Sequence, residues 1–409
     1  MRGPRAARLA GLVAVACAVG CGRGAAPAAP GADAIAALEA ELRARPGDGA
    51  VLYALAMMSD RAGDVDGALG WLARLAATPW DAGLDPADFE QLRARAAPRF
   101  AAARAAVERR WVRVDAAREV LRVGERDLLP EGMEVDPATG ELLLSSGRKR
   151  KVVRVAADGT TRDLVAPAQD GLLATLGLRV DRARGVLWVA SAAAPFMERA
   201  DDTPAGVSRL HAFALATGAL VARFELPAPS LLNDVAVLPD GRAVVTDSAG
   251  DAVWVTGAAG RLEPFVAAGA VVGPNGVAVG ADGATVYVAT WRGIVAVDVA
   301  TRRIAPVPLP AGAPNLAGID GLYVHGGALI GIQNAVGRPR VVRVRLAPPA
   351  GVEILESASP IVDNPTTGVI VDGGLVFMAR RNRERVFMGG DPATLGDIVI
   401  ARVPLPIAR

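Results

Sequence analysis

Hydrophobic positions follow two different spacings along the chain. From Asp33 to about Arg110, apolar residues recur at intervals of three and four, strand-forming residues are few, and Pro46-Gly47 and Thr78-Pro79 interrupt the run. This spacing predicts helices separated by turns. After Trp111 the pattern changes to short Val- and Leu-rich segments bounded by Gly, Asp and Pro. That pattern predicts an all-β domain.

One six-residue phrase recurs in the β part of the sequence. Its six copies read EGMEVD, LGLRVD, NDVAVL, NGVAVG, DGLYVH and TGVIVD, and they begin at Glu131, Leu176, Asn233, Asn275, Asp320 and Thr367. Successive copies start 42 to 57 residues apart, which is about the length of one four-stranded blade. The repeat therefore predicts an all-β six-bladed propeller.

The last blade is short of one strand. A turn and a second hydrophobic strand follow each phrase, as in Glu141–Ser146, but the chain ends soon after Asp397–Leu405. Either Trp111–Val114 or Val120–Val123 could supply the missing strand. Such pairing would join both ends of the domain in one sheet and remove an exposed edge.

The helical part resembles a tetratricopeptide repeat between Val51 and Leu75. The positions that match the buried large and small residues of that repeat are Leu52, Leu55, Ala56, Gly63, Ala68 and Leu72. Only one full repeat is evident, and fewer than about three rarely stand alone. We therefore expect a small N-terminal α-helical domain that packs on the propeller as a cap or spacer. A protein partner bound through this segment stays open.

The N-terminus has the pattern of an export signal. Three arginines at positions 2, 5 and 8 precede the apolar stretch Leu9–Gly20, which is too short to cross a bilayer. Ala18-Val19-Gly20-Cys21 resembles a lipobox, in which the cysteine is lipidated. The alternative is an ordinary cleaved secretory signal. With Cys17 lost in the signal and Cys21 acylated, no thiol would remain in the folded domains.

These patterns divide the chain into four parts. We expect a lipoprotein signal at 1–20, a flexible tether at 21–32, a tetratricopeptide-like helical segment at 33–110 and the propeller at 111–409. The resulting protein would be an envelope lipoprotein, held at the outer membrane through lipid on Cys21.

Composition and charge narrow the function. The hydrophobic fraction of 52% and the charged fraction of 22% are typical of globular domains. A formal net charge of +2 argues against a nucleic-acid partner, which needs a concentrated basic surface. No long uncharged apolar run follows residue 21, so we expect membrane contact through the lipid anchor only.

The phrase starts place candidate ligands around the propeller axis. The first strand of each blade lines the central channel, so equivalent positions form a ring. Four of the six starts, Glu131, Asn233, Asn275 and Asp320, carry side-chain oxygens. Carboxylates crowded in a narrow channel need a cation. All-oxygen ligands suit Ca²⁺ first, and Mg²⁺ or Mn²⁺ next, rather than Zn²⁺, which stays open as a further alternative.

At these residues the chain resembles the senescence marker protein/gluconolactonase/regucalcin family of six-bladed propellers. The order of that family's motifs is reproduced by Glu131, Asn233-Asp234, Asn275-Gly276 and Asp320-Gly321, within a resemblance that covers about 125–409. The resemblance implies a channel metal held by Glu131, Asn275 and Asp320, with Asn233 beside it contacting water or substrate. It also implies metal-dependent hydrolysis of an ester or lactone with Asp320 as general base.

The positions at which this chain departs from the family are ones that would contact the substrate, whereas the residues that would bind the metal are present. Lactone-hydrolysing members often carry Arg where this chain has Leu231, and Gly where it has Val235. The histidine pair of paraoxonase-type lactonases has no counterpart, because His211 and His325 lie at different phases of their blades.

Two alternatives remain open at this stage. The Asn-Gly and Asp-Gly pairs could merely shape the entry into each inner strand. The protein could then be a non-catalytic interaction scaffold with a structural ion or none. Two further features stand outside the phrases: Asn334 could approach the channel, and the basic run Arg380–Arg385 is expected to form a rim loop.

Overall fold

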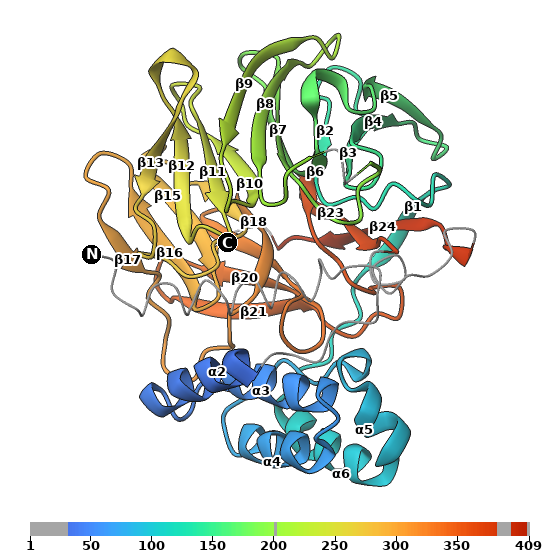
Figure 1. Ribbon diagram of the computed structural model, residues 1–409, viewed down its shortest axis with the longest axis vertical. Coiled ribbons are helices and arrows are strands. Elements are labelled where there is room, and N and C mark those ends of the chain that lie inside the picture. The colour runs from blue at the N-terminus through green and yellow to red at the C-terminus, as the bar shows by residue number, and fades with distance from the viewer. Residues whose placement is uncertain (1–31, 200–202, 383–393, 407–409) are drawn as a thin grey trace.

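The fold is a six-bladed β-propeller preceded by a small helical domain, as the phrase repeat predicts (Figure 1). A computed structural model describes residues 32–199, 203–382 and 394–406. The expected signal, Cys21 and the tether up to residue 31 lie outside these residues, as do residues 383–385 of the basic run. The helices are α2 (Ala32–Ala44), α3 (Gly49–Arg61), α4 (Val65–Ala76), α5 (Glu90–Arg95) and α6 (Ala97–Val107), with short 3₁₀ turns at Pro86–Asp88 and Glu108–Arg110.

Each blade is a four-stranded antiparallel sheet whose first strand lies innermost. Blade 1 contains β2 (Met133–Val135), β3 (Leu142–Ser146), β4 (Lys151–Val155) and β5 (Thr161–Val165). Blade 2 contains β6 (Ala174–Asp181), β7 (Val186–Ala192), β8 (Ser208–Ala214) and β9 (Leu220–Leu226). Blade 3 contains β10 (Leu232–Val237), β11 (Ala243–Asp247), β12 (Ala252–Thr256) and β13 (Leu262–Val266). Blade 4 contains β14 (Val277–Val279), β15 (Thr285–Thr290), β16 (Gly293–Asp298) and β17 (Ile304–Pro306). Blade 5 contains β18 (Ile319–His325), β19 (Ala328–Gln333), β20 (Arg340–Arg345) and β21 (Gly351–Glu356). All five inner strands of these blades fall on a phrase.

Blade 6 joins the two ends of the β domain. It contains β22 (Gly368–Val371), β23 (Gly374–Arg380), β24 (Ile398–Pro404) and, outermost, β1 (Arg118–Val123). β1 pairs antiparallel with β24 from Arg118 opposite Arg402 to Val123 opposite Ile398. Of the two candidate segments, Val120–Val123 is therefore the one that closes the ring, whereas Trp111–Val114 forms no strand. Closure by the N-terminal strand ties blade 6 to the start of blade 1.

Close packing at the axis explains the glycine in the phrase. A Cβ on Gly132, Gly177 or Gly276 would lie 2.3 to 2.5 Å from the carbonyl oxygen of the first phrase residue in the next blade. Carbon cannot approach oxygen so closely, so the second phrase position must be glycine there. Blade 3 has Asp234 instead, and its carboxylate accepts hydrogen bonds from the backbone N–H groups of Val235 (2.9 Å) and Val277 in blade 4 (3.0 Å).

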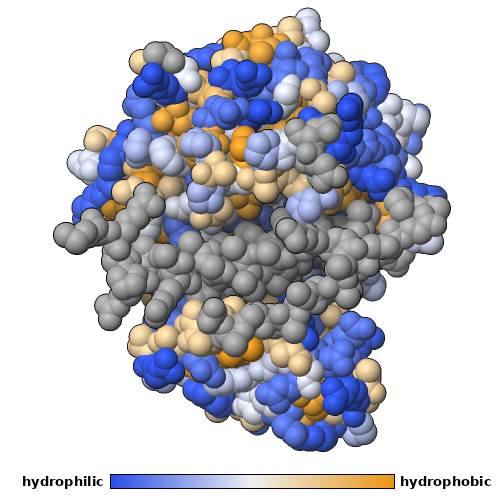
Figure 2. All heavy atoms as spheres, viewed as in Figure 1, coloured by the Kyte–Doolittle hydropathy of each residue, from blue (hydrophilic) through white to orange (hydrophobic). Residues whose placement is uncertain are grey.

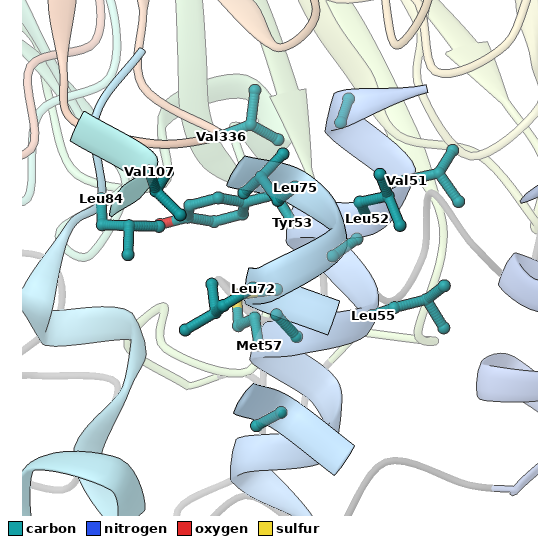
Figure 3. Packing of buried hydrophobic residues seen from close by; sticks show 14 of the residues in the cluster. Val51, Leu52, Tyr53, Leu55, Met57, Leu72, Leu75, Leu84, Val107 and Val336 are labelled. Carbon is teal, nitrogen blue, oxygen red and sulfur yellow. The ribbon is translucent and has the colours of Figure 1, made fainter. Parts of the chain in front are cut away.

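The helical domain shares its hydrophobic core with the propeller. Helices α3 and α4 form an antiparallel hairpin, and Asp48 caps α3 by accepting from Ala50 N at 3.1 Å. Figure 3 shows Val336, from the connection between β19 and β20, facing the same cluster as Tyr53 and Leu75. None of the described helices is long and apolar enough to cross a membrane.

The surface of both parts is mixed in polarity. On the face in Figure 2, hydrophilic and hydrophobic residues alternate over the propeller and the helical domain. The large hydrophobic side chains that are exposed in the described parts of the chain are Val112, Val120, Leu220 and Val221. They are scattered over a linker and two outer strands, as single exposed apolar residues commonly are.

A buried arginine fixes the helical domain against blade 5. Arg340 is 1% exposed, and its Nη1 lies 3.0 Å from Asp81 Oδ2 in the segment that follows α4. Its Nε donates to Gln333 Oε1, and Gln333 in turn donates to Asn315 O at 3.2 Å. Another inter-domain ion pair, Arg292 with Glu41 at 3.0 Å, leaves its arginine 46% exposed.

We predict that Arg340→Met lowers the free energy of unfolding by about 3 kcal/mol, because it leaves Asp81 without its buried partner. Arg292→Met removes the same charge from the same boundary but should cost less than about 1 kcal/mol, because water screens that pair. Chemical denaturation of both variants and the wild type measures the difference. Equal losses of unfolding free energy in the two variants would show that the burial of Arg340 adds nothing to the stability that its ion pair provides.

A buried histidine lies in blade 2. His211 in β8 is fully buried, stacks on Phe213 with ring centroids 5.5 Å apart, and places Nε2 3.3 Å from Asp170 O. Its Nδ1 is buried with no hydrogen-bond partner. Burial lowers the pKa of His211 from 6.5 to about 4, so the folded protein keeps this ring neutral where an unfolded chain would protonate it.

Stability should therefore fall as the pH drops from about 6.5 to about 4, because the unfolded state binds the extra proton in that window. The expected loss from His211 is about 3 kcal/mol across the window, at about 1.4 kcal/mol per pH unit. His211→Phe should be less sensitive to acid by that amount, although it loses the contact to Asp170 O. Urea unfolding of both proteins at several pH values measures this, and a pH-independent difference would contradict it.

Candidate metal centre

The structure brings the six phrase starts together around the axis. Glu131 and Asn275 lie just before β2 and β14, and Asn233 and Asp320 lie within β10 and β18. Contacts at the glycine position run from blade 1 to 2, from 2 to 3 and from 4 to 5, and Thr367 Oγ1 of blade 6 donates at 2.6 Å to Glu131 O, just before blade 1. Among the side chains, Thr366 links Glu131 and Asp320, whereas Asn233 bonds to Ser248 and Asn275 Oδ1 has no partner. Convergence of the four on one cation stays a prediction.

A single threonine hydroxyl connects the two carboxylates of the ring. Thr366 Oγ1 lies 2.9 Å from Asp320 Oδ2 and 3.2 Å from Glu131 Oε2. A hydroxyl has one proton to donate, so it can serve only one of these oxygens at a time. Thr366 alone therefore cannot satisfy both carboxylates, a condition that favours a further proton donor or a cation at this point.

The two asparagines complete the ring on its other side. Asn275 Oδ1 is buried and accepts no hydrogen bond, and the next residue, Gly276, packs against the backbone of Asp320. Asn233 Nδ2 donates to Ser248 Oγ at 3.1 Å, and Ser248 Oγ donates to Pro274 O at 2.7 Å. A buried amide oxygen without a donor is costly unless something positive meets it.

Residues that directly follow the second strand of a blade support the ring. Ser248 follows β11 and holds Asn233. Asn334 follows β19, and its Nδ2 donates to Asp320 Oδ2 and to Pro365 O, both at 2.6 Å. The expected approach of Asn334 to the channel is thus confirmed.

The third residue of this kind, Arg381, corrects an expectation. It follows β23, is 1% exposed, and its Nη1 forms an ion pair with Glu131 Oε2. The interpretation of Arg380–Arg385 as a rim loop is therefore wrong for Arg381. The signal that could have found it is positional, because it occupies the same place in blade 6 as Ser248 in blade 3 and Asn334 in blade 5.

A second layer of charge lies next to the ring. Arg179 Nη1 lies 3.0 Å from Glu134 Oε1 and its Nε donates to Val235 O at 3.1 Å. Its guanidinium carbon lies 5.9 Å from the centroid of the Tyr323 ring. Burial raises the pKa of Glu134, and it raises that of Asp234 to about 6. One arginine thus connects blades 1, 2, 3 and 5 at the axis.

The donor set fits a hard divalent cation. Within the described residues no three His, Cys, Asp or Glu side chains stand together as a metal-binding group, so a cation would rely on both carboxylates and amides. Carboxylate and amide oxygens are the ligands that Ca²⁺ and Mg²⁺ prefer. The unpartnered Asn275 Oδ1 and the shared Thr366 hydroxyl fit such an ion, with Glu131 engaged by Arg381 as well.

Comparison with known proteins gives structural neighbours. No family model matches the sequence, and no curated protein matches it. Among solved structures, a gluconolactonase from Xanthomonas campestris is 19% identical, with 72% of this chain and 96% of that chain covered and a TM-score of 0.46. A luciferin-regenerating enzyme is 12% identical, with 71% and 95% covered and a TM-score of 0.49. Virginiamycin B lyase from Staphylococcus aureus is 15% identical, with 64% and 81% covered and a TM-score of 0.47. At these values the likeness concerns the fold alone.

Proposed function

We propose that this protein binds a divalent cation in the channel ring and hydrolyses a small ester or lactone at the cell envelope. The observations that carry the proposal are the Thr366 hydroxyl shared by Glu131 and Asp320 and the unpartnered, buried amide oxygen of Asn275 in the blade before that of Asp320. Asp320, Asn275, Asn233 and Glu131 would hold the cation, with Ca²⁺ as the first candidate. When bound, the cation would polarise the substrate carbonyl and favour loss of a proton from water.

The contacts of Asp320 suit a general base. Asn334 and Thr366 both donate to Oδ2, which fixes the carboxylate plane, while Oδ1 accepts no hydrogen bond from the described residues. Asp320 Oδ1 would take a proton from water as the water oxygen bonds to the carbonyl carbon. The carbon–oxygen bond of the ester then breaks, and the same proton leaves on the alcohol oxygen.

Asn233 would orient the water or the substrate oxygen. Its Nδ2 is held by Ser248, so its side-chain plane is fixed and Oδ1 is available as an acceptor. Leu231, two residues earlier, presents an apolar side chain where the resembling lactonases often carry arginine. The substrate is therefore proposed to be less polar than a sugar lactone.

The second candidate is a non-catalytic interaction protein. A groove of about 510 Å³ lies on the helical domain and is lined by residues that include Ile35, Glu39, Trp71 and Arg74. Arg74 stacks over the Trp71 ring with its guanidinium carbon 4.7 Å from the centroid. This groove favours a protein partner bound through the helices, with the propeller ion structural or absent.

Divalent ions should stabilise the protein in proportion to occupancy, because they bind the folded state. We predict that Ca²⁺ raises the melting temperature after treatment with a chelator. Asp320→Asn should weaken Ca²⁺ binding at least about tenfold, because it removes a charged ligand. Asn233→Ala should weaken it less, and Asp320→Asn should also abolish hydrolysis in an ester and lactone panel.

Asp372→Asn is the matched control, since Asp372 ends the blade 6 phrase away from the ring and its side chain has no role in the proposal. Calorimetric titration of the purified protein measures these affinities. If Ca²⁺, Mg²⁺ and Mn²⁺ leave both the calorimetric signal and the melting temperature unchanged, the interaction protein is the surviving candidate.

The envelope location is also a proposal. Gly22 after Cys21 provides no acidic residue, a context that favours outer-membrane sorting in Gram-negative lipoproteins. Cys21→Ala should move the protein from the membrane fraction to the soluble fraction of disrupted cells, because the lipid anchor is lost. Retention of this variant in the membrane fraction would contradict the lipobox interpretation.

A further inference from the structure

Arg381 is held in place by two neighbours at once. Its Nη1 contacts Glu131 Oε2, while its Nη2 and Nε donate to Asn364 Oδ1 at 2.7 and 3.0 Å. The backbone oxygen of Asn364 also accepts from Nε at 3.1 Å. The arginine side chain is 1% exposed and that of Glu131 is 12% exposed. The guanidinium is thus a fixed, buried charge beside the ring.

The fixed positive charge of Arg381 lowers the net negative charge that a cation would encounter at the ring. Arg381 already compensates the charge of Glu131, so Asp320 supplies the remaining formal charge of the ring. A divalent ion that binds Glu131 must share or displace the guanidinium, and it must tolerate a like charge nearby. Both effects weaken ion binding, because attraction to carboxylates is the main source of affinity at such sites.

We propose that Arg381 is a built-in competitor for the ring cation, which occupies Glu131 and keeps divalent-ion affinity low. This inference rests on the cation site of the proposed function and assigns its regulation. Anything that draws Arg381 away from Glu131 strengthens ion binding. A merely structural ion pair, by contrast, would stabilise the fold and leave ion affinity unchanged, and a pair that positions Glu131 as a ligand would make affinity fall when Arg381 is removed.

The test is a calorimetric Ca²⁺ titration of the full-length protein in detergent micelles, after removal of bound ions with a chelator. Arg381→Met removes the charge but keeps an apolar chain of similar length, and it should bind Ca²⁺ at least about tenfold tighter than the wild type. Arg381→Lys keeps the charge and should stay close to the wild type. In the Glu131→Gln background, Arg381→Met should gain less than about threefold, because the contested carboxylate is gone.

Arg380→Met is the matched control. Arg380 precedes Arg381 and carries the same charge, but it is 38% exposed and its Nε lies 3.8 Å from Asp363. Loss of its charge should change Ca²⁺ affinity less than about threefold, because the charge is screened by water. A tenfold gain in this control would mean that any positive charge in the region matters, and it would overturn the specific role of Arg381.

A second variant avoids the loss of a buried arginine, which could unfold the protein. Asn364→Asp places a carboxylate against the guanidinium and should draw it from Glu131, so Ca²⁺ should bind at least about threefold tighter. This gain should disappear in the Glu131→Gln background. Asn364 has a φ of 55°, a conformation that aspartate also tolerates.

The outcomes separate this inference from the proposed function. If the wild type binds Ca²⁺ and Asp320→Asn abolishes binding, but Arg381→Met and Asn364→Asp bind no tighter, only the competitor role is overturned. If neither the wild type nor Arg381→Met binds Ca²⁺, Mg²⁺ or Mn²⁺, the cation site fails and this inference fails with it. Tighter binding in both variants, with loss of the gain in Glu131→Gln, supports the competitor role.

Discussion

The close approach of six inner strands at one axis is the constraint on which the rest of the structure depends. Where the strands meet, a Cβ on Gly132, Gly177 or Gly276 would collide with the carbonyl oxygen of the next blade, so the phrase is glycine at that position for a steric reason. The same approach puts the preceding side chain of each phrase on the channel. The close backbone packing therefore gathers the polar residues that begin the phrases into a ring around the axis. For Asn275-Gly276, both residues of the pair thus have one physical cause, the packing of neighbouring blades.

Crowding at the axis also decides the electrostatics. Glu131, Glu134, Asp234 and Asp320 meet two guanidinium groups, those of Arg179 and Arg381. With all four carboxyls ionised, these groups carry two more negative than positive charges. The protein relieves part of this excess with backbone N–H donors, and burial raises the pKa of Asp234 to about 6, which brings partial protonation within reach. The part that remains lies at Asp320, where a divalent cation would balance it and could also meet the unpartnered amide oxygen of Asn275.

Sequence reasoning reached the fold because the phrase is a local pattern that repeats. Blade number follows from the spacing of the phrase, whereas the sequence narrows the closing strand to two segments, of which Val120–Val123 is the one that pairs. The sequence did not predict the contacts of Arg381 and Thr366, because their partners are distant along the chain. Arg381 of blade 6 contacts Glu131 of blade 1. Thr366, one residue before the last phrase start, contacts Glu131 of blade 1 and Asp320 of blade 5. Only the observed pairing of the second strands shows that Ser248, Asn334 and Arg381, each directly after such a strand, contact ring residues. The chemistry beyond a cation site depends on substrate contacts that no local pattern contains.

The connection between β19 and β20 gives the helical domain a role in the same site. Asn334 at its start holds Asp320, and two residues later Val336 is buried in the core of the helical domain. Arg338 N then donates to Ala82 O at 2.9 Å. A six-residue connection that is fixed to the ring at one end and to the helices at the other cannot shift at either end alone, because packed interiors transmit displacement. The helical domain therefore supports the orientation of Asp320 in addition to covering blade 5. A partner that displaced the helical domain would therefore act on Asp320 through Asn334.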